Sequence, residues 1–151
     1  MKIVDLNVLL YAVNRDAEHH AQARRWWETA VNGDETIGLP WVVLLGFLRI
    51  ATNPRIFEAP LSAADAMAKI DSWLERPTVK AVAEKPDHLT ILRSLLGASG
   101  TAGNLTTDAH LAAIAISRDA ILVSFDNDFG RFEDLRWEHP LKTSTGRPRG
   151  R

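Results

Sequence analysis

The stretch that most constrains the fold runs from Leu105 to Phe132, with the sequence LTTDAHLAAIAISRDAILVSFDNDFGRF. Ala109 to Ser117 is apolar on nearly every face, which predicts a helix that is buried on most sides. Arg118-Asp119 then breaks the helical pattern. Ile121 to Phe125 is an apolar run too short for another helix, so it favours a buried parallel strand. This succession predicts an α/β fold built on a parallel sheet.

Acidic residues follow the predicted strands. Lys2 to Val4 opens the chain as a strand and Asp5 comes directly after it, while Asp126 and Asp128 follow the later strand. In an open α/β sheet, ligands bind outside the carboxyl ends of the strands, near the point where strand order reverses. Asp108 begins a helix packed on the same sheet, so we expect it at this edge too. Crowded carboxylates raise one another's pKa, and an all-oxygen cluster suits Mg²⁺ or Mn²⁺.

Each of these acids also has an ordinary structural interpretation. Asp5 could be a turn residue, Asp108 a helix N-cap, and Asp126-Asn127-Asp128 a turn held by its own side chains. Taken singly, none of them indicates a site. The metal-site hypothesis depends on all of them falling independently on one predicted edge of the sheet.

Composition limits the class of protein. The chain has 151 residues, 46% of them hydrophobic and 25% charged, which is the balance of an ordinary globular domain. A formal net charge of -1 excludes a wholly basic surface, so any nucleic-acid binding must come from local patches and from a metal ion that neutralises the acids. The absence of cysteine excludes disulfides and thiolate sites. No run approaches the roughly 20 apolar residues of a membrane span, so we expect a cytoplasmic protein.

The rest of the chain completes one domain, which we place at residues 1–141, and we expect residues 142–151 to form a basic, flexible tail. Further strands are predicted at Thr36–Leu39, Thr78–Val82 and, as a last edge strand or loop, Leu135–Leu141. Further helices are predicted at Ala17–Asn32, at Trp41–Ile50 with Pro40 at the first helical position, at Ala63–Glu75 capped by Ser62, and from Pro86 to about Leu96. No linker separates two domains.

Several features outside the acidic edge have two interpretations. Arg24-Arg25 beside Trp26-Trp27 could be a surface on which RNA bases stack, or the tryptophans could anchor a helix to the core. Arg55 could contact a phosphate or be a plain surface residue. The glycine-rich loop Gly97–Asn104 lacks the strand and lysine of a phosphate cradle, which favours a flexible approach to the cleft. His110 diverges from Asp108 on the helix, so we expect it to support the site or lie on the surface.

Four blocks resemble the PIN-domain ribonucleases, in particular the VapC toxins of bacterial VapBC toxin-antitoxin pairs and their mycobacterial-type branch. In chain order these blocks are DLNVLLY from Asp5, FLRIATNPRIF from Phe47, TDAHLAA from Thr107 and SFDNDF from Ser124. They occur in the order and spacing of the family and together span residues 3 to about 132. Each block alone is weak, and the combination is specific.

The resemblance implies an α/β/α sandwich around a parallel sheet of about four to five strands. It implies an endoribonuclease, a hydrolase dependent on Mg²⁺ or Mn²⁺, that cleaves tRNA or rRNA and leaves a 3′-hydroxyl and a 5′-phosphate. By position, Asp5, Asp108 and Asp126 would be catalytic metal ligands with Asp128 completing the site, and Asn7 and Thr107 would orient them. The resemblance also implies a homodimer and a cognate VapB antitoxin whose C-terminal segment covers the cleft.

The chain departs from the family pattern at Gly46, where many members carry a glutamate in the buried helix. This departure favours one well-bound ion over a complete two-metal site, and it keeps open a catalytically weakened PIN-fold binding module. A third alternative is a phosphatase that uses Asp5 as nucleophile. Such sites need an aspartate two places on, where this chain has Asn7.

Overall fold

The computed structural model describes residues 1–100 and 102–142. Within them, five strands form one sheet in the spatial order β3-β2-β1-β4-β5, and every pairing is parallel. The strands are β1 (Lys2–Val4), β2 (Ile37–Pro40), β3 (Val79–Val82), β4 (Ile121–Val123) and β5 (Trp137–Glu138). The predicted parallel α/β sheet is confirmed. Most of the predicted tail, residues 143–151, lies outside the described residues.

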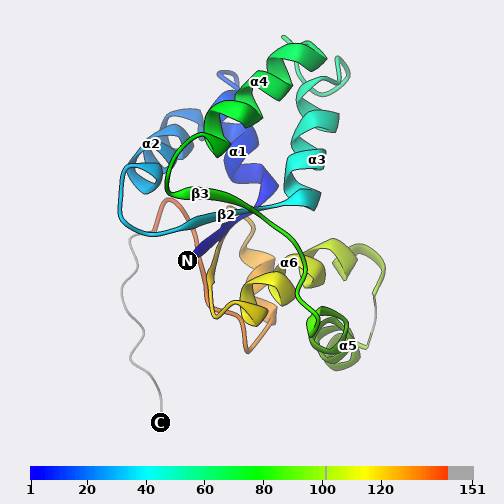
Figure 1. Cartoon of the computed structure of the whole chain (residues 1–151). Coiled ribbons are helices and arrows are strands. Elements are labelled where there is room, and N and C mark those ends of the chain that lie inside the picture. The colour runs from blue at the N-terminus through cyan, green and yellow to red at the C-terminus, as the bar shows by residue number, and fades with distance from the viewer. Residues whose placement is uncertain (101, 143–151) are drawn as a thin grey trace.

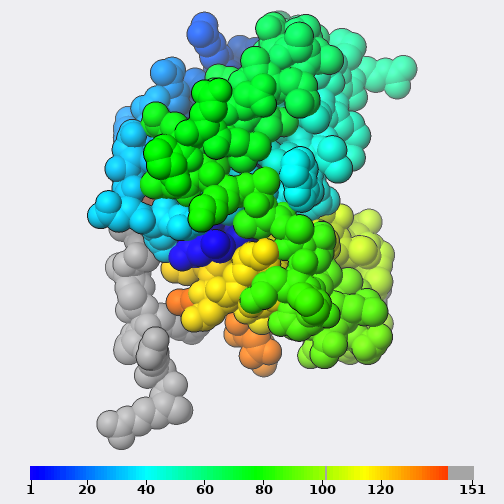
Figure 2. Space-filling view, viewed as in Figure 1, coloured from blue at the N-terminus to red at the C-terminus, as the bar shows by residue number. Residues whose placement is uncertain are grey.

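Helices cover both faces of the sheet, which gives the predicted three layers (Figure 1). Figure 1 shows four helices above the sheet, α1 (Leu6–Val13), α2 (His20–Val31), α3 (Trp41–Ala51) and α4 (Ala63–Leu74). Below it lie α5 (His88–Ser99) and α6 (Thr106–Ser117). In the space-filling view of Figure 2, the green side chains of α4 cover much of the upper half of this face. No helix within the described ranges is long and apolar enough to cross a bilayer.

Several element boundaries differ from the prediction, and three of these differences have a clear local cause. The sequence analysis assigned no helix to residues 6–13, which form α1 with Asp5 as its N-cap. Pro40 is not the first helical residue but the extended N-cap of α3, because it still pairs with Val82 as the last residue of β2. α5 continues to Ser99 and ends at Gly100, whose φ of 71° is a left-handed conformation that glycine adopts without strain.

The helix α6 is buried as its all-round apolar pattern predicts. Its residues from Leu111 to Ala115 are almost completely inaccessible, as are Ile3 of β1 and Leu122 of β4. The alanines among them let the helix approach the sheet closely. The helix that carries Asp108 is therefore a rigid part of the core.

Three aromatic rings tie α2, α3 and α4 together. Trp27 packs edge-on against Trp73 with ring centroids 5.6 Å apart, and Trp73 packs against Phe47 at 4.8 Å. Trp27 is only 9% exposed, and Arg24 is paired with Glu28 at 2.9 Å. Of the two interpretations of the Arg-Trp segment, core anchoring therefore holds for Trp27, which is not available to stack on RNA.

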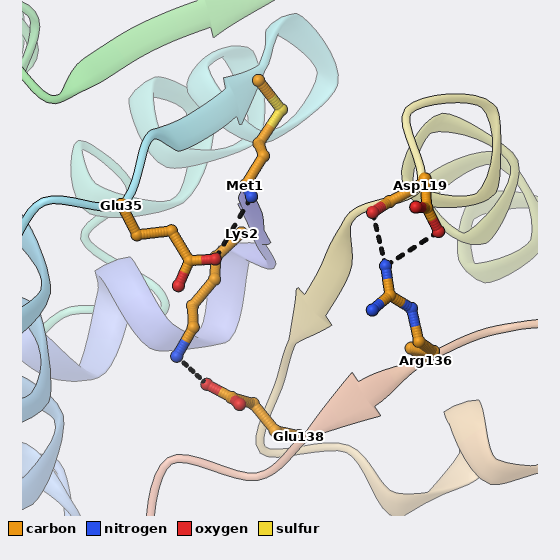
Figure 3. Close-up of polar contacts among 6 residues, drawn as sticks. All are labelled: Met1, Lys2, Glu35, Asp119, Arg136 and Glu138. Carbon is orange, nitrogen blue, oxygen red and sulfur yellow. Dashed lines mark hydrogen bonds and ion pairs between the residues drawn. The ribbon is translucent and has the colours of Figure 1, made fainter. Parts of the chain in front are cut away.

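Ion pairs secure the short edge strand β5 (Figure 3). The Lys2 ammonium reaches across β4 to Glu138 at 2.6 Å, and both side chains are mostly buried. The Arg136 guanidinium donates to both the carbonyl and the carboxylate of Asp119, in the turn that leads into β4. Exposed pairs of this second kind stabilise little. The Lys2–Glu138 pair is the one that joins the first and last strands.

We predict that Trp27→Ala lowers the free energy of unfolding by about 3–5 kcal/mol, because it leaves a cavity beside Trp73. Trp41→Ala is the matched control. Trp41 is 52% exposed, so its loss is expected to change stability by no more than about 0.5 kcal/mol. Urea unfolding followed by circular dichroism measures both. Similar losses for the two variants would contradict the assignment of Trp27 to the core.

Candidate functional site

The carboxyl ends of β1 and β4 lie side by side at the point where strand order reverses. From β1 the sheet grows through β2 to β3, and the chain then returns to the other side of β1 as β4. Asp5 follows β1, and its N–H donates to the Val123 carbonyl of β4 at 2.9 Å. In open α/β sheets this is the edge at which ligands bind.

Asp5 is fixed on both carboxylate oxygens. The Leu6 N–H donates to Oδ1 at 2.7 Å, which caps α1, and the Ser124 hydroxyl donates to Oδ2 at 2.7 Å. The side chain is 9% exposed. Burial raises the pKa of Asp5, and nearby Asp126 raises it further, while the bonds from Ser124 and Leu6 lower it.

Asn7 connects the two strand ends through its side-chain amide. Its Nδ2 donates to Asp5 Oδ2 at 3.3 Å and to Ser124 Oγ at 3.1 Å, and its Oδ1 accepts the Phe125 N–H at 3.1 Å. These contacts support the predicted role of Asn7 in orienting Asp5, and that role stays a prediction. They also explain why asparagine suits this position, since it both donates and accepts.

Asp126 is both a turn-capping residue and a candidate site residue. It accepts the Asp128 N–H at 2.8 Å and so caps the short 3₁₀ helix η2 (Asn127–Arg131), while the residue stays partly exposed. Asp128 is exposed and lies 3.5 Å from the Arg131 guanidinium. The predicted turn is therefore real, and it holds Asp126 toward the other carboxylates.

Asp108 is not the N-cap of its helix. Leu105 holds that place without a side-chain bond, and Asp108 sits in the first turn of α6, where its carboxylate accepts no hydrogen bond from the described residues. The pKa of Asp108 is raised to about 6, chiefly by burial and then by Asp126 and Asp5. Arg131 opposes this rise. The structure thus brings Asp5, Asp108 and Asp126 together, as the strand-end argument predicts.

We define Asp5, Asp108 and Asp126 as the carboxylate cluster. Thr107 and Arg55 are both exposed, and Arg55 lies in the loop between α3 and α4. A Cβ on Gly46 would lie 2.7 Å from the Leu6 side chain, so this position faces the residue directly after Asp5. The family's glutamate position therefore borders the site here without contributing charge.

Histidines 88 and 110 make a contact that the sequence did not indicate. His110 Nδ1 lies 3.0 Å from His88 Nε2, and His110 Nε2 lies 3.3 Å from Glu84. His110 therefore faces α5 and not the carboxylates. His88 is half-buried, and its Nδ1 has no partner within the described part of the chain.

Ser124 is the residue that sequence reasoning missed. It is fully buried and bonds with Asp5, Asn7 and the Asp126 N–H. A single hydroxyl at the end of an apolar strand was the available signal. Arg131, the cation that faces Asp108, was also missed because the turn that places it cannot be derived from spacing alone.

The donor set of the cluster fits a hard divalent cation. All the donors are oxygens. Neighbouring carboxylates help to raise the pKa of Asp5 and of Asp108, so a cation would relieve the repulsion at these two side chains. Among the described residues, no three acidic or histidine side chains are already gathered closely enough to hold a metal ion. Coordination would therefore require these side chains to turn toward a common point.

The hollow of about 460 Å³ between α2, α4 and the end of α1 is a separate feature. Its polar lining includes Arg15, Arg24, Lys69 and Arg76, and none of the clustered carboxylates borders it. The candidate chemistry therefore belongs to the open edge of the sheet and not to this cavity.

Comparison with known proteins identifies the family. A family model described as PIN domain matches residues 2–135. The chain is 46% identical over 140 residues to Ribonuclease VapC37 of Mycobacterium tuberculosis, across 93% of this chain and 97% of that protein. It is 49% identical over 142 residues to Ribonuclease VapC33 of the same species, across 94% and 99% of the two chains.

Solved structures agree at the level of the fold. VapBC2 from Rickettsia felis, bound to a promoter DNA fragment, matches with a TM-score of 0.68 at 21% identity over 91% of this chain and 97% of that chain. Mycobacterium tuberculosis VapC20, a Sarcin-Ricin loop cleaving toxin, matches with a TM-score of 0.65 at 19% identity over 90% and 99%. The family model and the curated relatives go further, and the chain belongs to the PIN-domain family and, within it, to the VapC proteins.

Proposed function

We propose that this chain is the toxin of a toxin-antitoxin pair and acts as an endoribonuclease dependent on Mg²⁺ or Mn²⁺. The observation that carries the proposal is the carboxylate cluster at the reversal of strand order, where burial and then the charges of Asp126 and Asp5 raise the pKa of Asp108 to about 6. The names of the relatives VapC37 and VapC33, both ribonucleases, support RNA as the substrate.

Asp5, Asp108 and Asp126 are the proposed ligands of the cation, with Asp128 completing the site. A bound divalent ion supplies positive charge at the scissile phosphate and makes a water molecule more acidic. Asn7 and Ser124 hold Asp5 in one orientation through the bonds described above. A carboxylate of the cluster accepts the proton of the attacking water. Cleavage of the P–O3′ bond then leaves a 3′-hydroxyl and a 5′-phosphate.

A VapB-type antitoxin is the proposed inhibitor, and a homodimer is the proposed assembly. VapBC complexes occur among the structures that share this fold. On α3, Trp41 and Leu45 are 52% and 59% exposed and lie four residues apart, so they form an apolar strip on one face of the helix. This strip begins at the carboxyl end of β2, which lies at the same edge of the sheet as the strand ends that carry Asp5 and Asp126. We propose it as an antitoxin contact.

Gly46 favours one competing function, a PIN-fold module that binds RNA or a partner without cleaving. The position borders Leu6 and adds no carboxylate to the cluster. The two functions differ in whether metal ions permit RNA cleavage.

We predict that the antitoxin-free protein cuts total tRNA or rRNA at discrete positions with Mg²⁺ or Mn²⁺ and leaves it intact in EDTA. Asp108→Asn is expected to lower the cleavage rate at least about 100-fold, because it removes one oxygen ligand of the ion. Gel electrophoresis and end-mapping of the products measure both results. Asp71→Asn on α4, an exposed acid away from the cluster, is the matched control and should retain the wild-type rate.

Intact RNA under every metal condition, with a folded protein, would refute the nuclease and leave the binding module. Cleavage that survives both EDTA and Asp108→Asn would assign the activity to another site or to a contaminant.

A second prediction concerns the stability of the metal-free protein. The pKa of Asp108 in the folded state lies above its ordinary value of 3.8, at about 6. Below pH 3.8, Asp108 is protonated in both the folded and the unfolded state. As the pH rises from 3.8 through about 6, the unfolded state loses its proton first, so the free energy of unfolding falls. In EDTA, the unfolding midpoint of the wild type is expected to fall over this window, and Asp108→Asn should flatten the fall.

Metal should reverse that loss in the wild type. At about 100 times the dissociation constant, a bound ion adds about 2.7 kcal/mol, or roughly 5–10 °C in the midpoint for a domain of this size. The metal-induced rise of the unfolding midpoint should be as large in Asp71→Asn as in the wild type and small in Asp108→Asn. Equal increments in both variants would place the metal elsewhere on the protein.

A further inference from the structure

Four aromatic and imidazole rings gather beside the carboxylate cluster. We call Tyr11, His19, Phe125 and His139 the ring cluster. The His19 and Phe125 rings are stacked, with centroids 5.5 Å apart and planes 11° apart. Tyr11 and His139 each approach Phe125 edge-on with centroids 5.0 Å apart, at 67° and 73°. The rings come from α1, the start of α2, the loop after β4 and the segment after β5.

The ring cluster is connected to the carboxylates through Phe125. This residue stands between Ser124, which donates to Asp5, and Asp126, and its N–H donates to Asn7. Consecutive Cα atoms are about 3.8 Å apart, which is less than the length of one nucleotide. Tyr11 lies on the helix that Asp5 caps. An RNA strand whose phosphate lies at the carboxylates would therefore place a neighbouring base at these rings.

The exposure of the rings separates this cluster from an ordinary core contact. Trp27, Trp73 and Phe47 are buried, whereas all four members of the ring cluster stay partly exposed. His19 has no capping bond at the start of α2 that would explain a histidine there. Lys142, exposed and bonded through its N–H to the His139 carbonyl, adds a cation beside the rings. π-faces next to a cation are how proteins bind unpaired bases.

We propose that the ring cluster is a base-stacking subsite that takes one unpaired nucleobase beside the phosphate bound at the carboxylates. This inference deepens the proposed ribonuclease function and rests on it. His19 is the specificity-determining member, because its ring is the one stacked face to face on Phe125.

The test compares two 12-nucleotide probes that carry the same phosphates, oligoadenylate and an abasic oligoribonucleotide. Fluorescence anisotropy with Ca²⁺ in place of Mg²⁺ gives both dissociation constants while a hard cation still holds the phosphate at the carboxylates, and gel electrophoresis of the same samples checks that the probes stay intact. The ratio of the two constants cancels the electrostatic part of binding. Stacking of one base predicts that the wild type binds oligoadenylate about 5- to 150-fold more tightly than the abasic probe. His19→Ala should bring this ratio close to one.

The neighbouring histidine provides a matched control. The ring of His20 contacts the Tyr11 carbonyl and not the other rings, so His20→Ala should keep the wild-type ratio. His19→Phe, which preserves a flat ring, should keep it too. His139→Ala is a second variant, on the other side of Phe125, in case His19→Ala does not fold, and it should lower the ratio about fivefold or more.

A wild-type ratio near one, or a ratio unchanged in His19→Ala and His139→Ala, would overturn the subsite. A lowered unfolding midpoint with an unchanged ratio would make the rings a structural contact only. The cleavage assay separates this failure from that of the proposed function. Metal-dependent cutting with an unchanged ratio refutes only the subsite, whereas a ratio that depends on His19 in a protein that never cuts RNA refutes only the nuclease.

Discussion

A buried carboxylate, that of Asp5, joins the two halves of the sheet, and the arrangement of the site depends on it. An ionised carboxylate away from water is costly unless hydrogen bonds replace its hydration. The Leu6 N–H supplies one such bond and begins α1 in the same step, and the Ser124 hydroxyl supplies the other from the end of β4. Because Asn7 and the Asp126 N–H also bond to Ser124, the direction of the acidic loop follows from this one pairing.

The same geometry carries a stability cost. Burial and neighbouring carboxylates raise the pKa of Asp5 and of Asp108, so the ionised form of these two acids is unfavourable for the folded state without a cation. Residues kept in spite of such a cost are characteristic of functional sites. At Gly46 the chain adds no further charge, and the contact with Leu6 is purely apolar. The cluster is thus less strained than one that includes a fourth buried acid.

The sequence predicts most of this fold because its strongest patterns are local. The apolar runs of β1 and β4 and the all-round apolar α6 each specify one element, and strand-end logic brings Asp5, Asp108 and Asp126 together. A predicted boundary was wrong where one residue belongs to two elements, because Pro40 both ends β2 and caps α3. The contacts of Ser124 with Asp5 and of His88 with His110 join residues 119 and 22 positions apart, so no local pattern contains them. The burial of Trp27 has the same kind of cause, because the residue that packs against it, Trp73, belongs to the distant helix α4.

The position of β1 in the middle of the sheet also sets the order in which the molecule can be completed during synthesis. Its neighbour β2 follows within 40 residues, but Ser124 is 119 residues away from Asp5, and the Lys2–Glu138 pair spans 136. At a translation rate of about 5–20 residues per second, Asp5 waits roughly 6 to 24 seconds for its partner. The carboxylate cluster is therefore among the last features to form, and no amino-terminal fragment that ends before β4 can assemble it on the ribosome.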